Sequence, residues 1–454
     1  MRLRLALALP SILLALPSGA QDIAARADSV MQAAEANGFS GVVLVARNGA
    51  VILERGYGFA NRAKRIPFTP RTVVQIGSNT KDFTAVGILQ LQDRGVLNLQ
   101  DKLSKYFPLA PADKKDITIL QLMNHEAGFP LGLGGDFEPV GREQLIDRAM
   151  KYKLLFSPGT KESYSNTGFS LLAAVIEMVS GKSYDEFVRD NILIPLGLKN
   201  TGFHLPGFPD STLAHGYRAG GEDAGTMMSK PRAADGPYWN LRGNGGMLST
   251  AADMHAFYTA LFGTDKLLKP ATRNLRFNPS EPVGLAGSDL VNFFLYERDP
   301  QSGTEMIIAS TNAEMKAPVV KRGLALVMGL PLMSGGGGGG AIARATGKPV
   351  SDEVSNVISE FIGAINKGDI AELRKFVTDH FDLSNGPPAD QRAQRLSVIR
   401  TDLGAIQIVR MTVVDDGSTQ VVVKTEKEGE ALIILDMEPS PPYRIKRLGL
   451  QVGG

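Results

Sequence analysis

Residues 76–81 read Ile-Gly-Ser-Asn-Thr-Lys and place a Ser-x-x-Lys pair, Ser78 and Lys81, at the start of a predicted helix. Residues three apart lie on one face of a helix, so the amine of Lys81 can reach the hydroxyl of Ser78. A serine hydroxyl is a poor nucleophile until a neighbouring base takes its proton. The stretch predicts a nucleophilic serine, but a single Ser-x-x-Lys also arises by chance in a chain of this length. The competing interpretation is a surface serine and lysine near a helix start.

The residues around this stretch predict strands at both ends of a domain and helices between them. Two strands, 41–46 and 50–57, are joined through Asn48-Gly49, a strong hairpin signal. After Ser78, apolar residues recur at helical spacing as far as Gly95. Further helices are predicted over 167–180 and from Thr250 onward, and further strands over 290–297 and 304–311. This order predicts an α+β fold, an antiparallel sheet flanked by helices with an all-helical insertion.

A glycine run predicts a domain boundary near the C-terminal quarter of the chain. Residues 335–340 are all glycine, which loses too much entropy on ordering to form the interior of a helix or strand. We therefore expect a large domain over 21–333 that contains Ser78, a linker over 334–349 and a small α+β domain over 350–454. In the last of these, an amphipathic helix precedes strand-like runs at 405–414, 419–426, 430–438 and 443–450.

Composition excludes several classes of protein. The chain has 454 residues, which favours two domains, and its formal net charge is only +2. No basic stripe is interleaved with aromatic residues, so nucleic acid is not an expected partner. The chain has no cysteine, which excludes disulfides and cysteine-ligated metal sites.

Residues 1–20 have the pattern of a secretory signal peptide. Arg2 and Arg4 are basic, residues 5–16 are mostly apolar, and residues 18–20 are small, as at a cleavage site. The apolar run is too short to span a bilayer, and no later stretch is long enough. We expect a secreted bacterial protein of the periplasm without a membrane span. The competing interpretation is an N-terminal core helix.

A tyrosine and an asparagine on a second segment add to the case for chemistry at Ser78. Tyr164-Ser165-Asn166 stands on a predicted loop before the helix 167–180. A phenol near a lysine can shuttle its proton, and an asparagine amide can bind both the lysine and a substrate. A second Tyr-x-Asn at 238–240 shows that the tripeptide is not rare, and an aromatic loop patch explains that copy equally well.

Four segments together resemble those that mark the beta-lactamase-related serine hydrolases. They are Ser78-x-x-Lys81, Pro158-Gly159 leading into Tyr164-Ser165-Asn166, residues 122–128 (Leu-Met-Asn-His-Glu-Ala-Gly) and residues 243–250 (Gly-Asn-Gly-Gly-Met-Leu-Ser-Thr). The family includes class C beta-lactamases, D-alanyl-D-alanine carboxypeptidases, D-aminopeptidases and esterases of the same fold. The resemblance, which covers about residues 25–330, implies a beta-lactamase/transpeptidase-like fold. The resemblance also implies that Ser78 is acylated, that Lys81 and Tyr164 move its proton, and that Asn166 contacts the substrate amide. Whether Lys81 or Tyr164 is the acylation base is left open.

The third motif of the family, Lys/His-x-Gly on an edge strand, is where this chain departs from the pattern. The best match is Leu285-Ala286-Gly287, followed by Ser288, so leucine stands where the resemblance implies a cation. The resemblance implies that the N–H groups of Ser78 and Ser288 form the oxyanion hole, with Leu285 and Gly287 in the substrate-binding strand. Lys321-Arg322-Gly323 also fits the motif but lies in a predicted helix. Without the cation we expect an esterase or peptidase rather than an efficient beta-lactamase.

We expect no cofactor and no metal. The five histidines are not paired at metal-ligand spacing; they are His125, His204, His215, His255 and His380. The expected partner is a small ester, amide or peptide substrate, with loops 129–145 and 203–240 setting specificity. The C-terminal domain resembles an NTF2-like cone and is a candidate for association into oligomers. A second hypothesis is a catalytically inactive penicillin-binding-like protein that binds cell-wall peptides.

Overall fold

The computed structural model describes residues 18–203, 207–218, 221–288, 291–311, 317–328, 350–383, 388–413, 419–426, 429–438 and 440–452. The chain divides into two compact units, residues 1–338 and 339–454. The division falls inside the predicted linker 334–349, which lies outside the described residues, as do His204 and most of the predicted signal peptide. Helix α1 (Ser18–Ala36) begins at the small residues of the predicted cleavage site.

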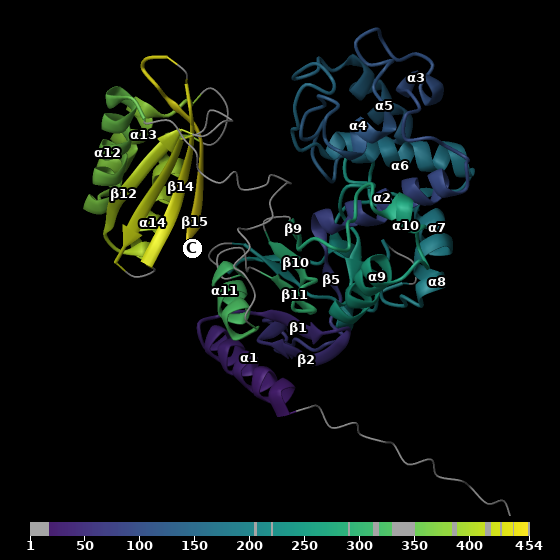
Figure 1. Ribbon diagram of the computed structural model, residues 1–454, viewed down its shortest axis with the longest axis horizontal. Helices are drawn as coiled ribbons and strands as arrows, with labels where there is room; N and C mark the ends of the chain where they lie inside the picture. The colour runs from purple at the N-terminus through teal and green to yellow at the C-terminus, as the bar shows by residue number, and fades with distance from the viewer. Residues whose placement is uncertain are drawn as a thin grey trace, which may run out of the picture. The chain divides into compact units, whose positions relative to one another are not determined.

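The first unit is built on one antiparallel sheet whose strands come from both ends of the unit, as predicted (Figure 1). Its order is β2-β1-β11-β10-β9. The strands are β1 (Gly41–Arg47), β2 (Ala50–Tyr57), β9 (Val283–Ser288), β10 (Asn292–Asp299) and β11 (Thr304–Thr311). Asn48, with a positive φ of 50°, makes the turn between β1 and β2 that its sequence predicted.

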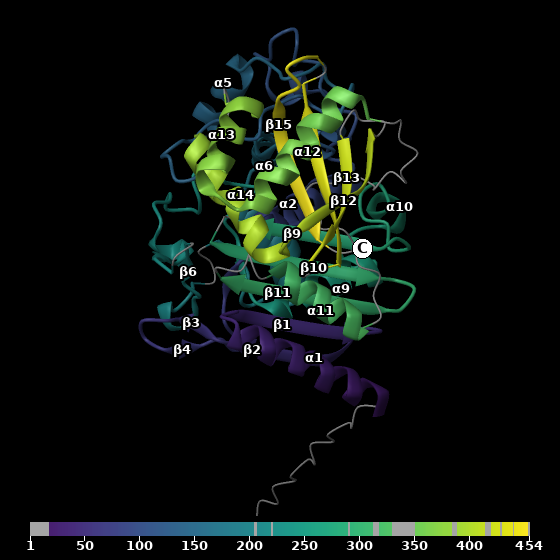
Figure 2. The same cartoon turned by 90° about the vertical axis from the view of Figure 1, so that its left-hand side faces the viewer.

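Two helices cover one face of this sheet (Figure 2). Helix α1 and helix α11 (Ala317–Met328) pack together, and Met31 and Leu324 are fully buried with Val43 and Ile308 of the strands. Alternate residues of β1 and β11 point to this face, as the period of two in a strand requires. The apolar face of each helix is thus removed from water together with one side of the sheet.

The other face of the sheet carries the larger core and the helical insertion. Helix α2 (Thr80–Asp93) runs through its centre, and Phe83 stacks on Phe257 of α9 (Ala251–Gly263) with ring centroids 4.0 Å apart. The insertion between β5 and β8 contains helices α3 (Leu103–Tyr106), α4 (Ile119–Met123), α5 (Arg142–Lys151), α6 (Asn166–Ser180), α7 (Tyr184–Val188) and α8 (Ile194–Leu196), a π-helical turn at Arg189–Leu193 and 3-10 turns at Asp210–Thr212 and Met227–Ser229. This arrangement confirms the predicted α+β class with a helical insertion.

One short strand pair holds the segment that carries Ser78. Strand β5 (Val74–Gln75) pairs with β8 (Leu248–Ser249), and Ile76 N donates to Met247 O at 3.0 Å. The chain then turns through a 3-10 turn, η1 (Gly77–Asn79), directly into α2. The remaining short elements are β3 (Phe59–Asn61), β4 (Ile66–Pro67), β6 (Gly216–Tyr217), β7 (Asp223–Gly225) and α10 (Pro270–Arg273).

In its described residues, the second unit contains three helices and a four-stranded antiparallel sheet of order β12-β13-β14-β15. Its elements are α12 (Asp352–Lys367), α13 (Ile370–His380), α14 (Ala389–Leu403), β12 (Ile406–Val413), β13 (Thr419–Thr425), β14 (Gly429–Met437) and β15 (Ile445–Val452). Alternating strand residues such as Val421 and Val423 join Phe361 of α12 in a separate core. Helices therefore precede a meander, and the NTF2-like resemblance stays a prediction.

Among the described residues, no helix combines the length and apolar character that crossing a bilayer demands. Nor does that part of the chain contain a group of three or more His, Cys, Asp or Glu residues that could hold a metal ion.

Candidate active site

Ser78 and Lys81 meet at the start of α2. Lys81 Nζ lies 3.1 Å from Ser78 Oγ, a hydrogen-bond distance, because one turn of the chain brings the two side chains to the same side. Ser78 is half-buried, whereas the lysine is only 3% exposed. The candidate nucleophile, Ser78, is thus accessible to a substrate, whereas the amine of Lys81 is buried away from solvent.

The amine of Lys81 has a second partner that the sequence interpretation did not foresee. Nζ donates to the backbone oxygen of Asn244 at 2.8 Å, and no bond to the Asn166 side chain accompanies it in the described part of the chain. The sequence allowed the Asn166 amide as a partner of the lysine, and the structure shows the Asn244 carbonyl in contact with it instead. The Asn244 carbonyl lies next to Lys81 because the segment 243–250 runs along the start of α2, where Met247 N donates to Thr80 Oγ1 at 3.3 Å.

Burial lowers the pKa of Lys81 to about 7, because the charged ammonium loses its hydration in the core. The neighbouring carboxylates of Asp82 and Asp136 raise the pKa and oppose this effect, and Arg276 lowers it further. A substantial fraction of Lys81 is therefore neutral near pH 7, which is what a base requires.

Tyr164 completes a three-residue arrangement around the serine oxygen. Its OH donates to Ser78 Oγ at 2.7 Å, and Lys81 Nζ lies 4.8 Å from the centroid of its ring. Ser165 fixes this placement, because it caps α6 by accepting from Gly168 N at 3.1 Å and its own hydroxyl donates to Pro130 O at 2.7 Å. Burial raises the pKa of Tyr164 to about 12, so the phenol is protonated in the resting site.

His125 supports Tyr164 from behind. The two ring centroids are 4.6 Å apart, and His125 Nδ1 accepts from Ser165 N at 3.1 Å. Burial lowers the pKa of His125 to about 3, so the ring is neutral and accepts at Nδ1. These contacts give His125 a structural role beside Tyr164.

Asn166 lies next to this group but is not joined to it. Its backbone N donates to Leu131 O at 2.8 Å, and its side-chain Oδ1 is buried without a hydrogen-bond partner among the described residues. An unpaired buried amide oxygen is costly in a folded protein. An N–H donor on a substrate would satisfy it, so its substrate role remains a prediction.

The third-motif strand β9 lies against the serine turn. Leu285 packs on the main core, and its backbone oxygen accepts from Asn79 Nδ2 at 3.3 Å. A Cβ atom added at Gly287 would stand 2.1 Å from Ile76 O and 2.5 Å from Ser78 N. One added at Gly77, whose φ is +53°, would stand 2.6 Å from Ser288 N. The backbones of Ser78 and Ser288 are therefore close neighbours, as two N–H groups of an oxyanion hole must be.

This close approach makes Gly287 a sensitive position. We expect Gly287→Ala to force β9 away from the turn, which separates the two N–H groups and lowers the rate of serine acylation about 100-fold or more, the usual effect of losing one oxyanion donor. Overpacking should also destabilise the fold by about 1–3 kcal/mol.

Acylation rates and thermal melting of Gly287→Ala measure these effects. Gly263→Ala is the matched control, because an added Cβ there has no atom within 4 Å and Gly263 ends a helix. An alanine at 287 with a normal acylation rate would contradict the assignment of β9 to the site.

A buried hydrogen-bond network lies beside Ser78, and the sequence analysis did not predict it. Asn79 Nδ2 donates to Tyr258 OH at 2.7 Å, and that hydroxyl donates to Asp82 Oδ2 at 2.8 Å. Burial raises the pKa of Asp82 to about 6, while Arg276, the Tyr258 hydrogen bond and Lys81 oppose the rise. The network ties α2, α9 and, through Asn79, strand β9 together. No short motif signals it, although Asn79 and Asp82 flank the Ser-x-x-Lys pair.

Two alternatives from the sequence do not reach the site. The amine of Lys321 pairs with the buried carboxylate of Glu297 at 2.5 Å on β10, so it does not replace the missing cation. The second Tyr-x-Asn joins loops instead, since Asn240 Nδ2 donates to Gly135 O at 3.0 Å and Trp239 N donates to Val140 O at 3.0 Å.

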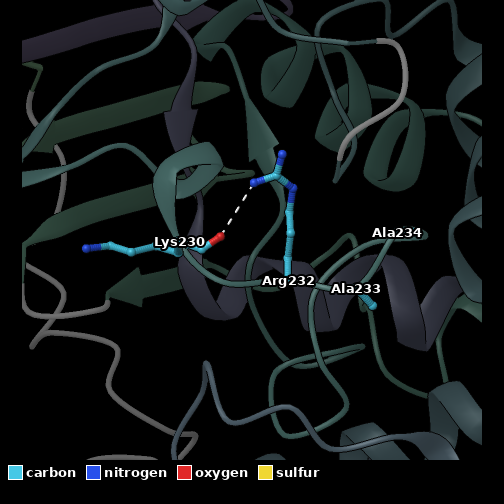
Figure 3. Close-up of a pocket in the computed structure, with 4 residues that line it drawn as sticks. All are labelled: Lys230, Arg232, Ala233 and Ala234. Carbon is cyan, nitrogen blue, oxygen red and sulfur yellow. Dashed lines mark hydrogen bonds between the residues drawn. The ribbon is translucent and has the colours of Figure 1, made fainter.

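A pocket elsewhere in the predicted specificity loop 203–240 has a volume of about 330 Å³ (Figure 3). It is lined by Lys230, Arg232, Ala233 and Ala234. Arg232 Nη1 donates to the backbone oxygen of Lys230 at 3.4 Å, and Lys230 Nζ donates to Ala224 O at 2.5 Å. None of the predicted catalytic residues lines this pocket.

The side chains of Ser78, Lys81 and Tyr164 together can perform nucleophilic acyl transfer. An accessible hydroxyl contacts an amine whose pKa is about 7 and a phenol that can exchange a proton with it. Ser78 also lies at the first turn before α2, where backbone N–H groups point outward.

Comparisons with known proteins show the family of this chain. The family profile described as Beta-lactamase matches residues 27–349. Penicillin-binding protein 4* of Bacillus subtilis (strain 168) is 27% identical over 287 residues, which cover 59% of this chain and 62% of that protein. The chain spans between 49% and 62% of the length of the first curated relatives it matches.

Solved structures share the fold. FmtA from Staphylococcus aureus has a TM-score of 0.58 at 24% identity and covers 69% of this chain and 90% of its own. The octameric penicillin-binding protein homologue from Pyrococcus abyssi has a TM-score of 0.58 at 20% identity and covers 94% of this chain and 89% of its own. Because the family profile extends over most of the chain and its first unit has the fold of these proteins, this chain belongs to the beta-lactamase family of serine hydrolases.

Proposed function

We propose that this chain hydrolyses esters or amides through an acyl-enzyme on Ser78. The observation that carries the proposal is that Ser78 Oγ lies within hydrogen-bond distance of both Lys81 Nζ, at 3.1 Å, and Tyr164 OH, at 2.7 Å. A surface Ser-x-x-Lys would have neither the buried amine nor the phenol from a distant segment.

The geometry supports a two-step reaction. A neutral Lys81 keeps one N–H on Asn244 O and turns its lone pair to the Ser78 hydroxyl, whose proton it takes directly or through Tyr164. The serine oxygen then bonds to the substrate carbonyl carbon, and the N–H groups of Ser78 and Ser288 hold the resulting oxyanion. The bond to the leaving group breaks as that group receives the proton through Tyr164. Water repeats the sequence on the acyl-enzyme and releases the acid and the serine.

Leucine at position 285 favours esters, or amides without a carboxylate at that place, over penicillins. A hydrogen bond to a charged group contributes about 1.5–3 kcal/mol, so its loss costs about ten- to a hundredfold on a carboxylate-bearing substrate. We therefore propose esterase or peptidase activity rather than efficient beta-lactamase activity.

The pH dependence of catalysis follows from Lys81. We expect kcat/KM for a neutral ester to rise with pH as Lys81 loses its proton, with a midpoint near its pKa of about 7. Protonation of Asp82, with a pKa of about 6, removes a negative charge beside Lys81 and makes the acid limb shallower. Tyr164, with a pKa of about 12, should cause no fall below pH 10. A flat profile between pH 5 and pH 9 would contradict Lys81 as the base.

The experiment that tests the proposal is a panel of substrates read by intact mass. Short-chain esters, a cephalosporin and D-amino-acid peptides are mixed with the full chain, and a fluorophosphonate probe serves as a general serine label. We expect a covalent adduct that peptide mapping places on Ser78, together with turnover of at least one ester or amide. No adduct and no turnover across the panel would refute the proposal.

A second candidate function is an inactive binder of cell-wall peptides, which the leucine at position 285 favours. Binding of peptidoglycan fragments without any adduct on Ser78 would support it over hydrolysis.

We also propose that the chain is exported to the periplasm through its N-terminal segment, because residues 1–20 have a signal-peptide pattern. N-terminal sequencing of the exported protein tests this. Association through the second unit is a further proposal, for which the octameric homologue is a precedent.

A further inference from the structure

Arg276 is a half-buried arginine that the reaction described above does not use. It follows α10, and its Nη1 donates to Met123 O at 3.0 Å. Its Nε is buried and has no hydrogen-bond partner among the described residues, and no carboxylate lies within ion-pair distance of it there. A guanidinium N–H that is buried without a hydrogen-bond acceptor loses its hydration at a cost in free energy. An unpaired guanidinium kept in this place calls for an explanation.

The contacts of Arg276 place it beside the catalytic group. Its Cζ lies 5.7 Å from the centroid of the Phe169 ring, and Lys81 Nζ lies 5.8 Å from the same centroid. The ring of His125, which packs against that of Tyr164, has its centroid 5.1 Å from the Phe169 centroid. The backbone oxygen that anchors Arg276 belongs to Met123, two residues before His125. The guanidinium and the amine of Lys81 therefore share one aromatic neighbour.

We propose that Arg276 is a positioning residue whose positive charge, next to the same Phe169 ring as the amine of Lys81, keeps Lys81 in its neutral, basic form. Two cations in one poorly hydrated region disfavour each other, and the group that can lose its proton does so. A guanidinium stays protonated across the working pH range, so the proton leaves Lys81. The inference rests on the proposed role of Lys81 as the base at Ser78.

The other charges around the two cations oppose this effect. Asp82, next to Lys81 on α2, and Asp136, on the loop before α5, favour the charged lysine. Asp82, Tyr164 and Glu162 favour the charged form of Arg276, although burial lowers its pKa. The same guanidinium lowers the pKa of Tyr164 and of His125. Its charge thus acts on each titratable member of the site in the direction that favours a free base and a neutral histidine.

The consequence concerns the working pH of the enzyme. With Arg276 present, the amine is ready to accept the Ser78 proton near neutral pH. Without it, Lys81 should hold its proton to higher pH, because Asp82 and Asp136 remain. At effective dielectric constants near 20, a charge several ångströms away changes a pKa by about one unit.

The test compares Arg276→Gln, Arg276→Lys and the matched control Arg273→Gln in the full chain. Arg273 also has a buried Nε without a hydrogen-bond partner among the described residues, but its Nη1 donates to Thr264 O at 2.8 Å and to Asp265 at 3.2 Å. Two readouts are used: the pH profile of kcat/KM for a neutral ester, and the titration of the Lys81 amine by NMR of lysine-labelled protein.

For Arg276→Gln we expect the acid limb and the Lys81 titration to move up by about one pH unit, which lowers kcat/KM about tenfold at pH 6 and little at pH 9. Arg276→Lys should retain most of the wild-type profile, and Arg273→Gln should leave it in place. A uniform loss of rate at every pH, with the Lys81 titration unmoved, would overturn the inference. A wild-type chain that never labels at Ser78 would refute the proposed function instead, and the NMR titration would still decide the role of Arg276.

Discussion

Replacing Ser78 by alanine is expected to lower turnover by a factor of about 10⁴ or more and to abolish covalent labelling. The hydroxyl is the atom that bonds to the substrate carbonyl, and neither Lys81 Nζ nor Tyr164 OH can take its place, because both lie beyond it at 3.1 Å and 2.7 Å. Whatever rate remains would come from binding and from the oxyanion donors. Progress curves with the best ester of the panel and intact-mass spectra after the fluorophosphonate probe measure both effects.

Ser163→Ala is the matched control for this variant. Ser163 is half-buried and precedes Tyr164 by one residue, but it lies outside the group formed by Ser78, Lys81 and Tyr164. It should retain both turnover and labelling. Equal rates for wild type and Ser78→Ala would mean that the observed hydrolysis does not pass through this serine, and the acyl-enzyme proposal would be wrong.

Replacing Lys81 by methionine should have the second largest effect, a loss of about 10³-fold in the rate of Ser78 acylation, within the usual range for removal of a general base. The fold should change little in stability, because two effects oppose each other. Removing a buried amine ends its desolvation cost, while Asn244 O loses the donor that it has at 2.8 Å. Stopped-flow acylation with the probe and thermal melting separate the two quantities.

Lys81→Arg distinguishes a base from a mere charge. The guanidinium keeps the positive charge but does not give up its proton in the working range. We therefore expect Lys81→Arg to be as slow as Lys81→Met. If the arginine variant acylated at nearly the wild-type rate, Lys81 would act through its charge alone, and the pH profile would need another explanation.

The sequence determined those parts of the site that depend on short-range geometry. Ser78 and Lys81 are three residues apart where a turn enters a helix, so helical periodicity alone brings them together. Asn48 at the hairpin and Thr250 at the start of α9 were likewise predictable, because each acts within a few residues of its own position. The resemblance of four segments extended this reading to Tyr164, 86 residues from Ser78.

Only the tertiary structure decided the remaining partners. The second acceptor for Lys81 is the backbone oxygen of Asn244, 163 residues away, and a backbone group has no residue type by which it could be recognised. Tyr258 reaches Asp82 from 176 residues away, and Arg276 reaches the same region from beyond α10. Such long-range contacts depend on how the helical insertion folds back on the sheet, and so does the burial that lowers the pKa of Lys81. The sequence identifies which side chain can act as a base, but the pKa of that side chain depends on the charges and the solvent that the fold places around it.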